Sequence, residues 1–189
     1  MAWLQRMAKR FKDSTLKKNS KIIVITGAES TGKSTLTKNL GTHFHAPFIP
    51  EIAREYIEKL NRRYNYEDVE TIAKIQVDEL CKFRKEESSY IFLDTWLIVT
   101  KIWFDVVFKK EPSWLNEEIK NTKVDLFLVC DTDIPWIADP VRENGGERRI
   151  WLHKEYMKTI KEFDFPYEII SGQNEERIKN AIMAIDMLK

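Results

Sequence analysis

KIIVITGAESTGKSTL, residues 21–36, joins a run of β-branched residues directly to a loop of small and polar ones. Its Gly27, Gly32, Lys33 and Ser34 fit the spacing G-x-x-x-x-G-K-[ST]. Glycines at these positions let the backbone turn its N–H groups towards phosphate oxygens, and a helix that follows adds unpaired N–H groups. The stretch therefore predicts a buried strand, a phosphate-binding loop and a helix.

Each polar side chain of this loop has an expected task. Lys33 would bring a positive charge to the β- and γ-phosphates, and Ser34 would offer its hydroxyl to Mg²⁺. Thr35 is placed to contact the α-phosphate. Within this loop we expect nine residues to hold ATP, and the later Arg148 and Arg149 are expected to join them: Gly27, Ala28, Glu29, Ser30, Thr31, Gly32, Lys33, Ser34 and Thr35.

Apolar runs alternate with helical patterns along the rest of the chain. Strands are expected at residues 21–27, 46–50, 90–95, 124–131 and 167–170, and helices at 34–44, 51–63, 66–87, 150–163 and 174–188. Residues 96–110 favour a helix by length and spacing, although their β-branched content leaves a strand as the alternative. Strands separated by helices predict an α/β P-loop NTPase fold, with a five-stranded parallel sheet covered by helices on both faces.

Length and composition indicate one globular domain over residues 21–189, preceded by a basic extension over residues 1–20. The extension is expected to be helical, with Trp3, Leu4, Met7 and Phe11 on one face. It could pack on the domain, remain a basic tail, or contact a membrane surface or nucleic acid.

The net charge of +1 gives no strong nucleic-acid signal. No apolar run reaches the roughly 20 residues of a transmembrane segment, and the N-terminus lacks the pattern of a secretory signal. Cys81 and Cys130 stand far apart and outside any metal-binding spacing, which favours a reducing, cytoplasmic location. The sequence leaves homo-oligomer formation open.

The apolar stretch YIFLDT places Asp94 at the end of a strand, where a carboxylate can hold Mg²⁺. A GTPase would have glycine three residues after this Asp, but Leu97 stands there. The guanine-reading pattern at Thr122–Asp125 precedes a strand instead of ending one. These features argue against a GTPase, and we interpret the guanine-reading pattern as a chance match.

A phosphotransferase also needs a carboxylate near the acceptor hydroxyl and cations around the transferred group. Glu51 follows the second strand and is the candidate general base or hydroxyl ligand, with Arg54 as a phosphate contact. The alternative is a helix N-terminus that is rich in acidic residues because the helix dipole favours them, with no role in catalysis. Arg142, Arg148 and Arg149 flank Gly145–Gly146 and predict a mobile arginine-bearing lid over the polyphosphate. An ordinary charged loop is the alternative there.

These motifs, in this order, resemble the ribosylnicotinamide kinase domain of bacterial NAD-salvage proteins. The resemblance covers roughly residues 21–172 and rests on GAESTGKSTL, PEIAREY, the Gln of IAKIQVDEL, FLDTWLIVTKIW and CDTDIPWIADPVRENGGERR. It implies a P-loop kinase that uses ATP and Mg²⁺ to phosphorylate the ribose 5′-hydroxyl of nicotinamide riboside. By the match, Glu51, Arg54 and Asp94 surround the acceptor ribose and metal, Arg142, Arg148 and Arg149 form the lid, and Asp139 orients the substrate or the arginines.

The sequence departs from the family pattern in ways that bear on the substrate. Trp96 stands where the family often has a second carboxylate, and Pro50 and Cys81 stand where some members place aromatic side chains around the nicotinamide ring. Trp96, Tyr56 or Trp136 could supply an aromatic face instead. Because 20 residues precede the domain, we expect no preceding adenylyltransferase domain.

The sequence therefore predicts a small-molecule kinase with Lys33, Glu51, Asp94 and Arg142 as catalytic residues. Nicotinamide riboside is the expected acceptor, with a deoxynucleoside or other nucleoside kinase as the alternative. A third hypothesis is a regulatory switch that binds ATP and a partner but transfers no phosphate to a metabolite. The basic extension would then contact the partner.

Overall fold

The computed structural model describes residues 20–138, 142 and 144–188. Its strands are β1 (Lys21–Thr26), β2 (Phe48–Ile49), β3 (Tyr90–Asp94), β4 (Leu126–Cys130) and β5 (Tyr167–Ile170). Its helices are α2 (Lys33–His43), α3 (Ile52–Glu58), α4 (Tyr66–Phe83), α5 (Leu97–Trp103), η1 (Phe104–Phe108), α6 (Leu115–Thr122), α7 (Gly146–Glu162) and α8 (Asn174–Asp186). The helix predicted for the N-terminal extension, and Asp139 of the predicted lid, lie outside the described residues.

The strands form one parallel five-stranded sheet in the order β2-β3-β1-β4-β5, as the sequence predicted. β1 is central because its apolar run allows burial on both faces and pairing along both edges. The register sets Ile25 beside Asp94 on one edge and Thr26 beside Val129 on the other. The carboxyl end of β1 therefore lies next to the carboxyl ends of β3 and β4.

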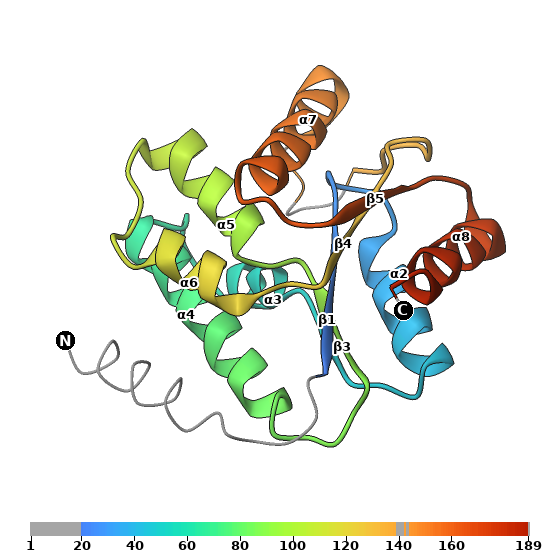
Figure 1. Cartoon of the computed structure of the whole chain (residues 1–189). Coiled ribbons are helices and arrows are strands. Elements are labelled where there is room, and N and C mark those ends of the chain that lie inside the picture. The colour runs from blue at the N-terminus through green and yellow to red at the C-terminus, as the bar shows by residue number, and fades with distance from the viewer. Residues whose placement is uncertain (1–19, 139–141, 143, 189) are drawn as a thin grey trace.

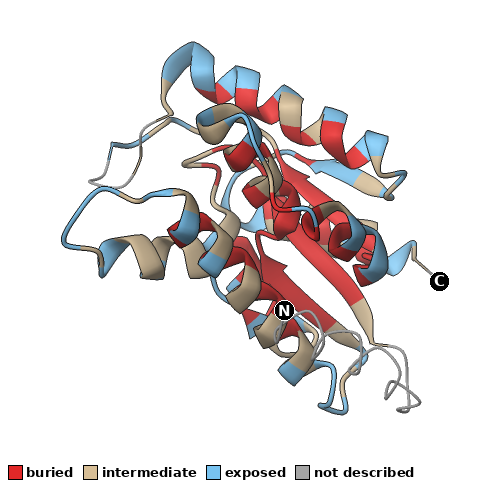
Figure 2. Cartoon of the chain, turned by 90° about the vertical axis from the view of Figure 1, so that its left-hand side faces the viewer, coloured by how far each residue is buried: buried red, intermediate tan, exposed pale blue. Residues whose placement is uncertain are grey.

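The two faces of the sheet carry separate apolar cores. Ile22 and Val24 belong to a cluster with residues of α4, α5, α6 and α7, whereas Ile23 and Ile25 pack with residues of α2 and α8. Alternate residues of a strand point to opposite faces, so a single apolar strand supplies both clusters. Figure 1 shows α2 and α8 on one side of the sheet and the other helices on the opposite side, and Figure 2 shows the buried sheet between them.

The segment 96–110 is helical, which decides the choice between helix and strand. α5 continues into the single π-helical turn η1, and Phe104 at the junction is fully buried. The Thr100 hydroxyl donates to Gln76 Oε1 at 2.9 Å inside the core, which ties α5 to α4. Its apolar residues therefore pack against neighbouring helices instead of pairing with the sheet.

Several predicted helices have different bounds in the structure, and α6 was not predicted from the sequence. α4 ends at Phe83, four residues before its predicted end. α3 ends at Glu58 and buries none of its residues, whereas the sequence predicted a helix to residue 63. α7 begins at Gly146, four residues before the predicted start, so it includes Arg148 and Arg149. Within the described part of the chain, no helix is both long and apolar enough to cross a membrane.

Candidate active site

The loop between β1 and α2 has the backbone conformation that a phosphate-binding loop needs. Gly27 has a φ of 135° and Gly32 a φ of 77°, values that L side chains rarely adopt. A Cβ atom on Gly27 would lie 2.7 Å from the main-chain oxygen of Cys130 at the end of β4. The first glycine is thus required both by its dihedral angle and by the close approach of the neighbouring strand.

The N-terminus of α2 is left uncapped. It has no capping side chain and no acidic residue in its first turn, whereas α4 begins with a capping box formed by Asn65 and Asp68. The first N–H groups of α2 and its positive dipole end therefore face the loop without a protein partner among the described side chains. This arrangement suits an anion such as a phosphate.

Lys33 places its ammonium group at the same loop. Its Nζ donates to the main-chain oxygen of Ala28 at 2.9 Å, and Thr31 Oγ1 donates to the same oxygen at 2.8 Å. The positive charge of Lys33 therefore lies beside the uncapped helix end, where both act on one bound anion.

Ser34 and Asp94 meet beside the loop. The Ser34 hydroxyl hydrogen-bonds the Asp94 carboxylate. Asp94 is deeply buried, and its Oδ1 atom has no hydrogen-bond partner among the described residues. Burial raises the pKa of Asp94 to about 6; the bond from Ser34 lowers it, the charge of Glu51 raises it and Lys33 lowers it. An alcohol and an unpartnered carboxylate oxygen are donors that Mg²⁺ prefers, so this pair fits that ion.

Glu51 lies at the same carboxyl edge of the sheet. It precedes α3 as its N-terminal cap residue, directly after the edge strand β2. Its negative charge acts on Asp94, and it also acts on the hydroxyl of Tyr156 from α7. The structure thus brings together Lys33, Ser34, Glu51 and Asp94, all of which the sequence singled out.

The predicted mobile lid is different in the structure. Two of its three arginines belong to the first turn of α7, and Gly145 lies against the ring of Trp136, where an added Cβ would come within 3.2 Å of the indole. Gly145 is therefore packed at a helix start, whereas Gly146 has open space around it. The expectation that Arg148 and Arg149 lie in a loop is wrong, because both lie in the first turn of α7.

The lid arginines have separate surroundings. Arg149 is buried and donates to main-chain carbonyls, including those of Glu29 and Ser30 in the phosphate loop. Arg148 is exposed; it donates to Asn144 Oδ1 at 2.8 Å and lies over the ring of Trp151.

The remaining segment is tied to the loop at several points. Arg142 donates to the main-chain oxygen of Ile137 at 2.6 Å. Asn144 donates from both its main-chain and side-chain nitrogens to the Glu29 carboxylate, at 2.9 and 2.6 Å. Ser30 Oγ accepts a bond from the Ile137 N–H at 2.9 Å. Glu29 and Ser30, predicted to hold ATP, therefore bind the segment that leads to α7 with their side chains.

The other residues predicted to bind the acceptor have separate surroundings in the structure. Trp96 is only 2 % exposed and belongs to the apolar core, so the expectation that it offers a face to a substrate ring is wrong. Tyr56 donates its hydroxyl to Asp68 Oδ1 at 3.2 Å, and Arg54 pairs with Glu58 along α3 at 2.9 Å. Trp136 lies against Gly145, on the segment that leads into α7.

The sequence analysis missed two buried polar residues of α7, His153 and Tyr156, which lie on the same face of the helix as Arg149. Arg149, His153 and Tyr156 follow helical spacing, and each is less than 9 % exposed. Asp131 lies 4.0 Å from His153 Nε2, while Glu29 and Glu51 act on Tyr156. The spacing i, i+4, i+7 of polar residues within an otherwise amphipathic helix could have revealed this face.

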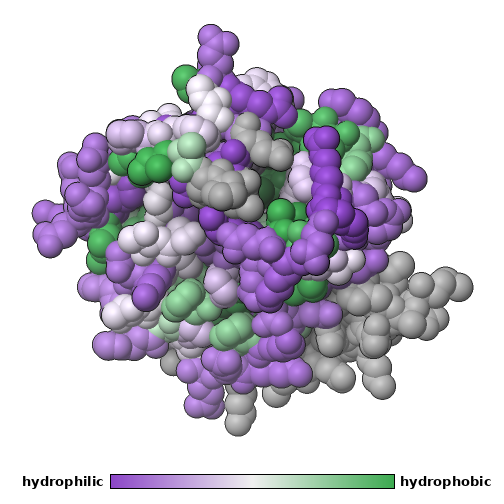
Figure 3. Space-filling model, turned by 180° about the vertical axis from the view of Figure 1, so that it is seen from behind, coloured by the Kyte–Doolittle hydropathy of each residue, from purple (hydrophilic) through white to green (hydrophobic). Residues whose placement is uncertain are grey.

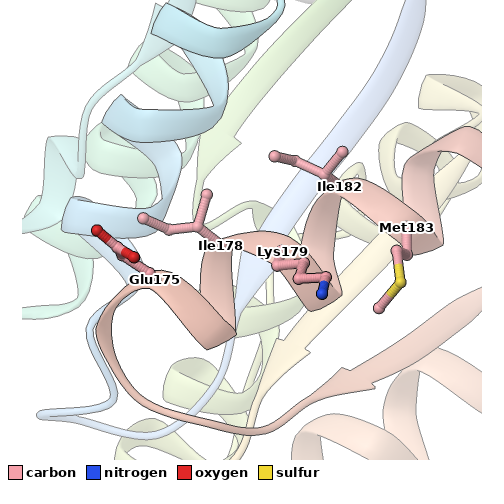
Figure 4. Close-up of a pocket in the computed structure, with 5 residues that line it drawn as sticks. All are labelled: Glu175, Ile178, Lys179, Ile182 and Met183. Carbon is pink, nitrogen blue, oxygen red and sulfur yellow. The ribbon is translucent and has the colours of Figure 1, made fainter.

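Two surface grooves lie outside this constellation. One, of about 410 Å³, runs beside β2 and is lined by Ile49, Pro50, Ile52, Glu55, Tyr56, Lys59, Ile75, Glu79 and Phe83. The other, of about 350 Å³, lies on α8 and is lined by Glu175, Ile178, Lys179, Ile182 and Met183 (Figure 4). Figure 3 shows that hydrophobic areas on the rear face are small and separate. Neither groove contains a phosphate-loop residue.

A glycine-rich loop, an uncapped helix start with Lys33, and Asp94 ending the adjacent parallel strand together define a P-loop nucleotide-binding protein. The chain belongs to the family described as "AAA domain", whose profile matches residues 22–177.

Among curated proteins, the chain is 26% identical over 128 residues to the trifunctional NAD biosynthesis/regulator protein NadR of Salmonella typhimurium. It is 25% identical over 130 residues to NadR of Escherichia coli. In each case the match covers 66% of this chain and 31% of the relative, so the chain spans about a third of their length.

The comparison with solved structures also finds NadR. A crystal structure of NadR with NAD and AMP-PNP and another with NR both have a TM-score of 0.75 and 28% identity, over 89% of this chain and 49% and 50% of those chains. A deoxyadenosine kinase from M. mycoides, at 14% identity and a TM-score of 0.63, shares the fold. The predicted fold and the predicted resemblance to NAD-salvage proteins are thus confirmed.

Proposed function

We propose that this protein is an ATP- and Mg²⁺-dependent kinase that phosphorylates the 5′-hydroxyl of a ribosyl substrate, with nicotinamide riboside as the preferred acceptor. One observation carries the proposal: two carboxylates lie near the phosphate loop, since Asp94 hydrogen-bonds Ser34 and the charge of Glu51 acts on Asp94. A pure nucleotide-binding switch needs one carboxylate for the metal, whereas a kinase also needs one for the acceptor hydroxyl.

Each of these residues has a task in phosphoryl transfer. The loop amides, the N-terminus of α2 and Lys33 bind the β- and γ-phosphates and offset the charge that develops during transfer. Ser34 and Asp94 would hold Mg²⁺, which when bound neutralises phosphate charge and orients the γ-phosphate. Glu51 orients the acceptor hydroxyl, and either Glu51 or Asp94 accepts its proton.

α7 lies near this edge of the site. It contacts α5, and the charge of Glu51 acts on the buried Tyr156 of α7. Arg142 and Arg148 lie on the segment before α7 and in its first turn, where they can add positive charge to the phosphates of a bound nucleotide.

The comparisons support the substrate class. The related NadR structures contain NR in one case and NAD with AMP-PNP in another, and that protein functions in NAD biosynthesis. Cys81 and Cys130 do not form a disulfide with each other, which suits a reducing compartment, so we place the activity in the cytoplasm.

A deoxynucleoside or other nucleoside kinase is the second candidate. Trp96 is in the core, and the positions expected to clamp a nicotinamide ring are Pro50 and Cys81, so no aromatic pair identified from the sequence selects a pyridinium ring. A nucleoside kinase would use the same two carboxylates.

ATP consumption measured with a panel of acceptors tests the proposal. The panel contains nicotinamide riboside, adenosine, cytidine, deoxyadenosine and a control without acceptor, each with and without Mg²⁺. We expect Mg²⁺-dependent turnover that is fastest with nicotinamide riboside, and a new phosphomonoester in the product. Turnover fastest with another nucleoside would select the second candidate, and turnover that no nucleoside raises above the control would refute a kinase function.

A further inference from the structure

The outer side of the phosphate loop is held by two buried arginines that come from distant parts of the chain. Arg149, in the first turn of α7, donates from Nε to the main-chain oxygen of Glu29 and from Nη2 to that of Ser30, both at 2.9 Å. Its third nitrogen, Nη1, donates to the main-chain oxygen of Ile134 at 2.9 Å. Each of the three guanidinium nitrogens thus donates to a backbone carbonyl.

Arg177, in α8, continues the same pattern. Its Nη1 donates to the main-chain oxygen of Thr31 at 2.9 Å and its Nε to that of Gly172 at 2.7 Å. Its Nη2 pairs with Asp133, whose other carboxylate oxygen accepts from the Gly172 N–H at 2.6 Å. Arg177 is only 4 % exposed. Three consecutive carbonyls, of residues 29, 30 and 31, are therefore bound by two guanidinium groups.

This arrangement has a direct consequence for the inner side of the loop. In a planar peptide the N–H and C=O groups point in opposite directions, so fixing carbonyls outwards fixes the adjoining N–H groups inwards. A cation on the carbonyl also polarises the peptide and strengthens the N–H as a donor. Ser30 has a φ of 57°, an unfavourable value for serine that surrounding bonds must maintain.

We propose that Arg149 and Arg177 are positioning residues that hold the phosphate loop in its phosphate-binding conformation without touching the nucleotide. This revises the phosphate-contacting role expected for Arg149, and no sequence motif pointed to Arg177. The inference rests on the nucleotide-binding part of the proposed function, not on the identity of the acceptor. Because α7 and α8 each supply one arginine, the loop is anchored to both faces of the sheet.

The test measures nucleotide binding in Arg149→Lys, Arg177→Lys and the double variant. Calorimetry with Mg²⁺ gives the dissociation constants of ATP, ADP and inorganic tripolyphosphate. Lysine keeps the charge but loses the multiple directed bonds, so we expect each single variant to weaken all three ligands by one common factor, about tenfold. The double variant should lose less than the product of the two factors, since both arginines hold the same loop.

Arg84→Lys is the matched control. Arg84 Nη2 donates to the main-chain oxygen of Thr122 at 2.6 Å, which joins the ends of α4 and α6. Thr122 precedes the amino end of β4, whereas the phosphate loop follows the carboxyl end of the parallel strand β1. This variant should lower the melting temperature while leaving the three dissociation constants unchanged. If Arg177→Lys does not fold, Asp133→Asn provides a second readout, because it weakens the pair that orients Arg177 and should raise the same constants by a smaller common factor.

Two results would overturn the proposal. Lower melting temperatures with unchanged dissociation constants would show that the arginines only support the fold, as Arg84 does. Weaker ATP binding with unchanged ADP binding in Arg149→Lys would show that Arg149 contacts the γ-phosphate directly. Neither result depends on an acceptor, so failure of nicotinamide riboside as a substrate would leave this test intact.

Discussion

Replacing Asp94 with asparagine should stabilise the free protein and abolish its activity. Burial raises the pKa of Asp94 from 3.8 to about 6, so the folded protein disfavours the ionised carboxylate at neutral pH. The folded state binds this proton more tightly than the unfolded state, and the free energy of unfolding therefore decreases as pH rises from about 4 to about 6. That pKa difference corresponds to ~3 kcal/mol, which a neutral asparagine recovers.

Urea unfolding of both proteins from pH 4 to pH 8, without nucleotide or Mg²⁺, measures the effect. The difference in unfolding free energy between variant and parent should be near zero at pH 4 and rise to ~3 kcal/mol above pH 6. Turnover should fall ~100-fold or more, because asparagine is a poor ligand for Mg²⁺.

Glu118→Gln is the control for this experiment. Burial raises the pKa of Glu118 in α6 to about 7, although Arg84 lowers it and Glu117 raises it. Its replacement should give a stability gain that grows with pH and leaves turnover unchanged. A constant stability difference across the pH range for Asp94→Asn, or a loss of stability at pH 8, would contradict the reasoning.

Further predictions concern the loop and the acceptor carboxylate. Lys33→Ala should abolish turnover with little change in melting temperature, since Lys33 lies at the loop surface; circular dichroism and ATP consumption check this. Glu51→Gln should lower turnover much more than ATP affinity, and parallel losses in both would refute an acceptor-side role. Gly27→Ala should cost ~2 kcal/mol or more, because its Cβ would lie 2.7 Å from the Cys130 oxygen at a φ of 135°. Gly146→Ala, with nothing within 4 Å, should cost about 1 kcal/mol and is its control.

Local features of the chain were predictable because their causes are local. The strand of residues 21–26 and the glycine loop after it are set by side-chain size and backbone freedom within one short stretch. Asp94 ends β3 and Glu51 follows β2 by two residues, and parallel strands end at one edge of the sheet, so their placement at that edge followed from the strand pattern. Residues 96–110 remained ambiguous because β-branched residues suit a buried helix as well as a strand.

The expectations that were wrong depended on packing between distant segments. Trp96 looked available for a substrate ring, but the helices around β3 bury it. Arg149 was predicted to belong to a flexible lid, but α7 begins earlier than predicted. In the first turn of α7, Arg149 donates to the main-chain oxygen of Glu29 in the phosphate loop.

The sequence alone determined the class of the protein, the phosphate loop and the carboxylates of the site, since spacing along the chain specifies strands, turns and helix starts. Only the tertiary structure decided which polar side chains donate to the main-chain carbonyls of the phosphate loop. Arg177 reaches Thr31 across 146 positions of the chain. Such a contact depends on how helices pack on the sheet, and one-dimensional spacing carries no record of that packing.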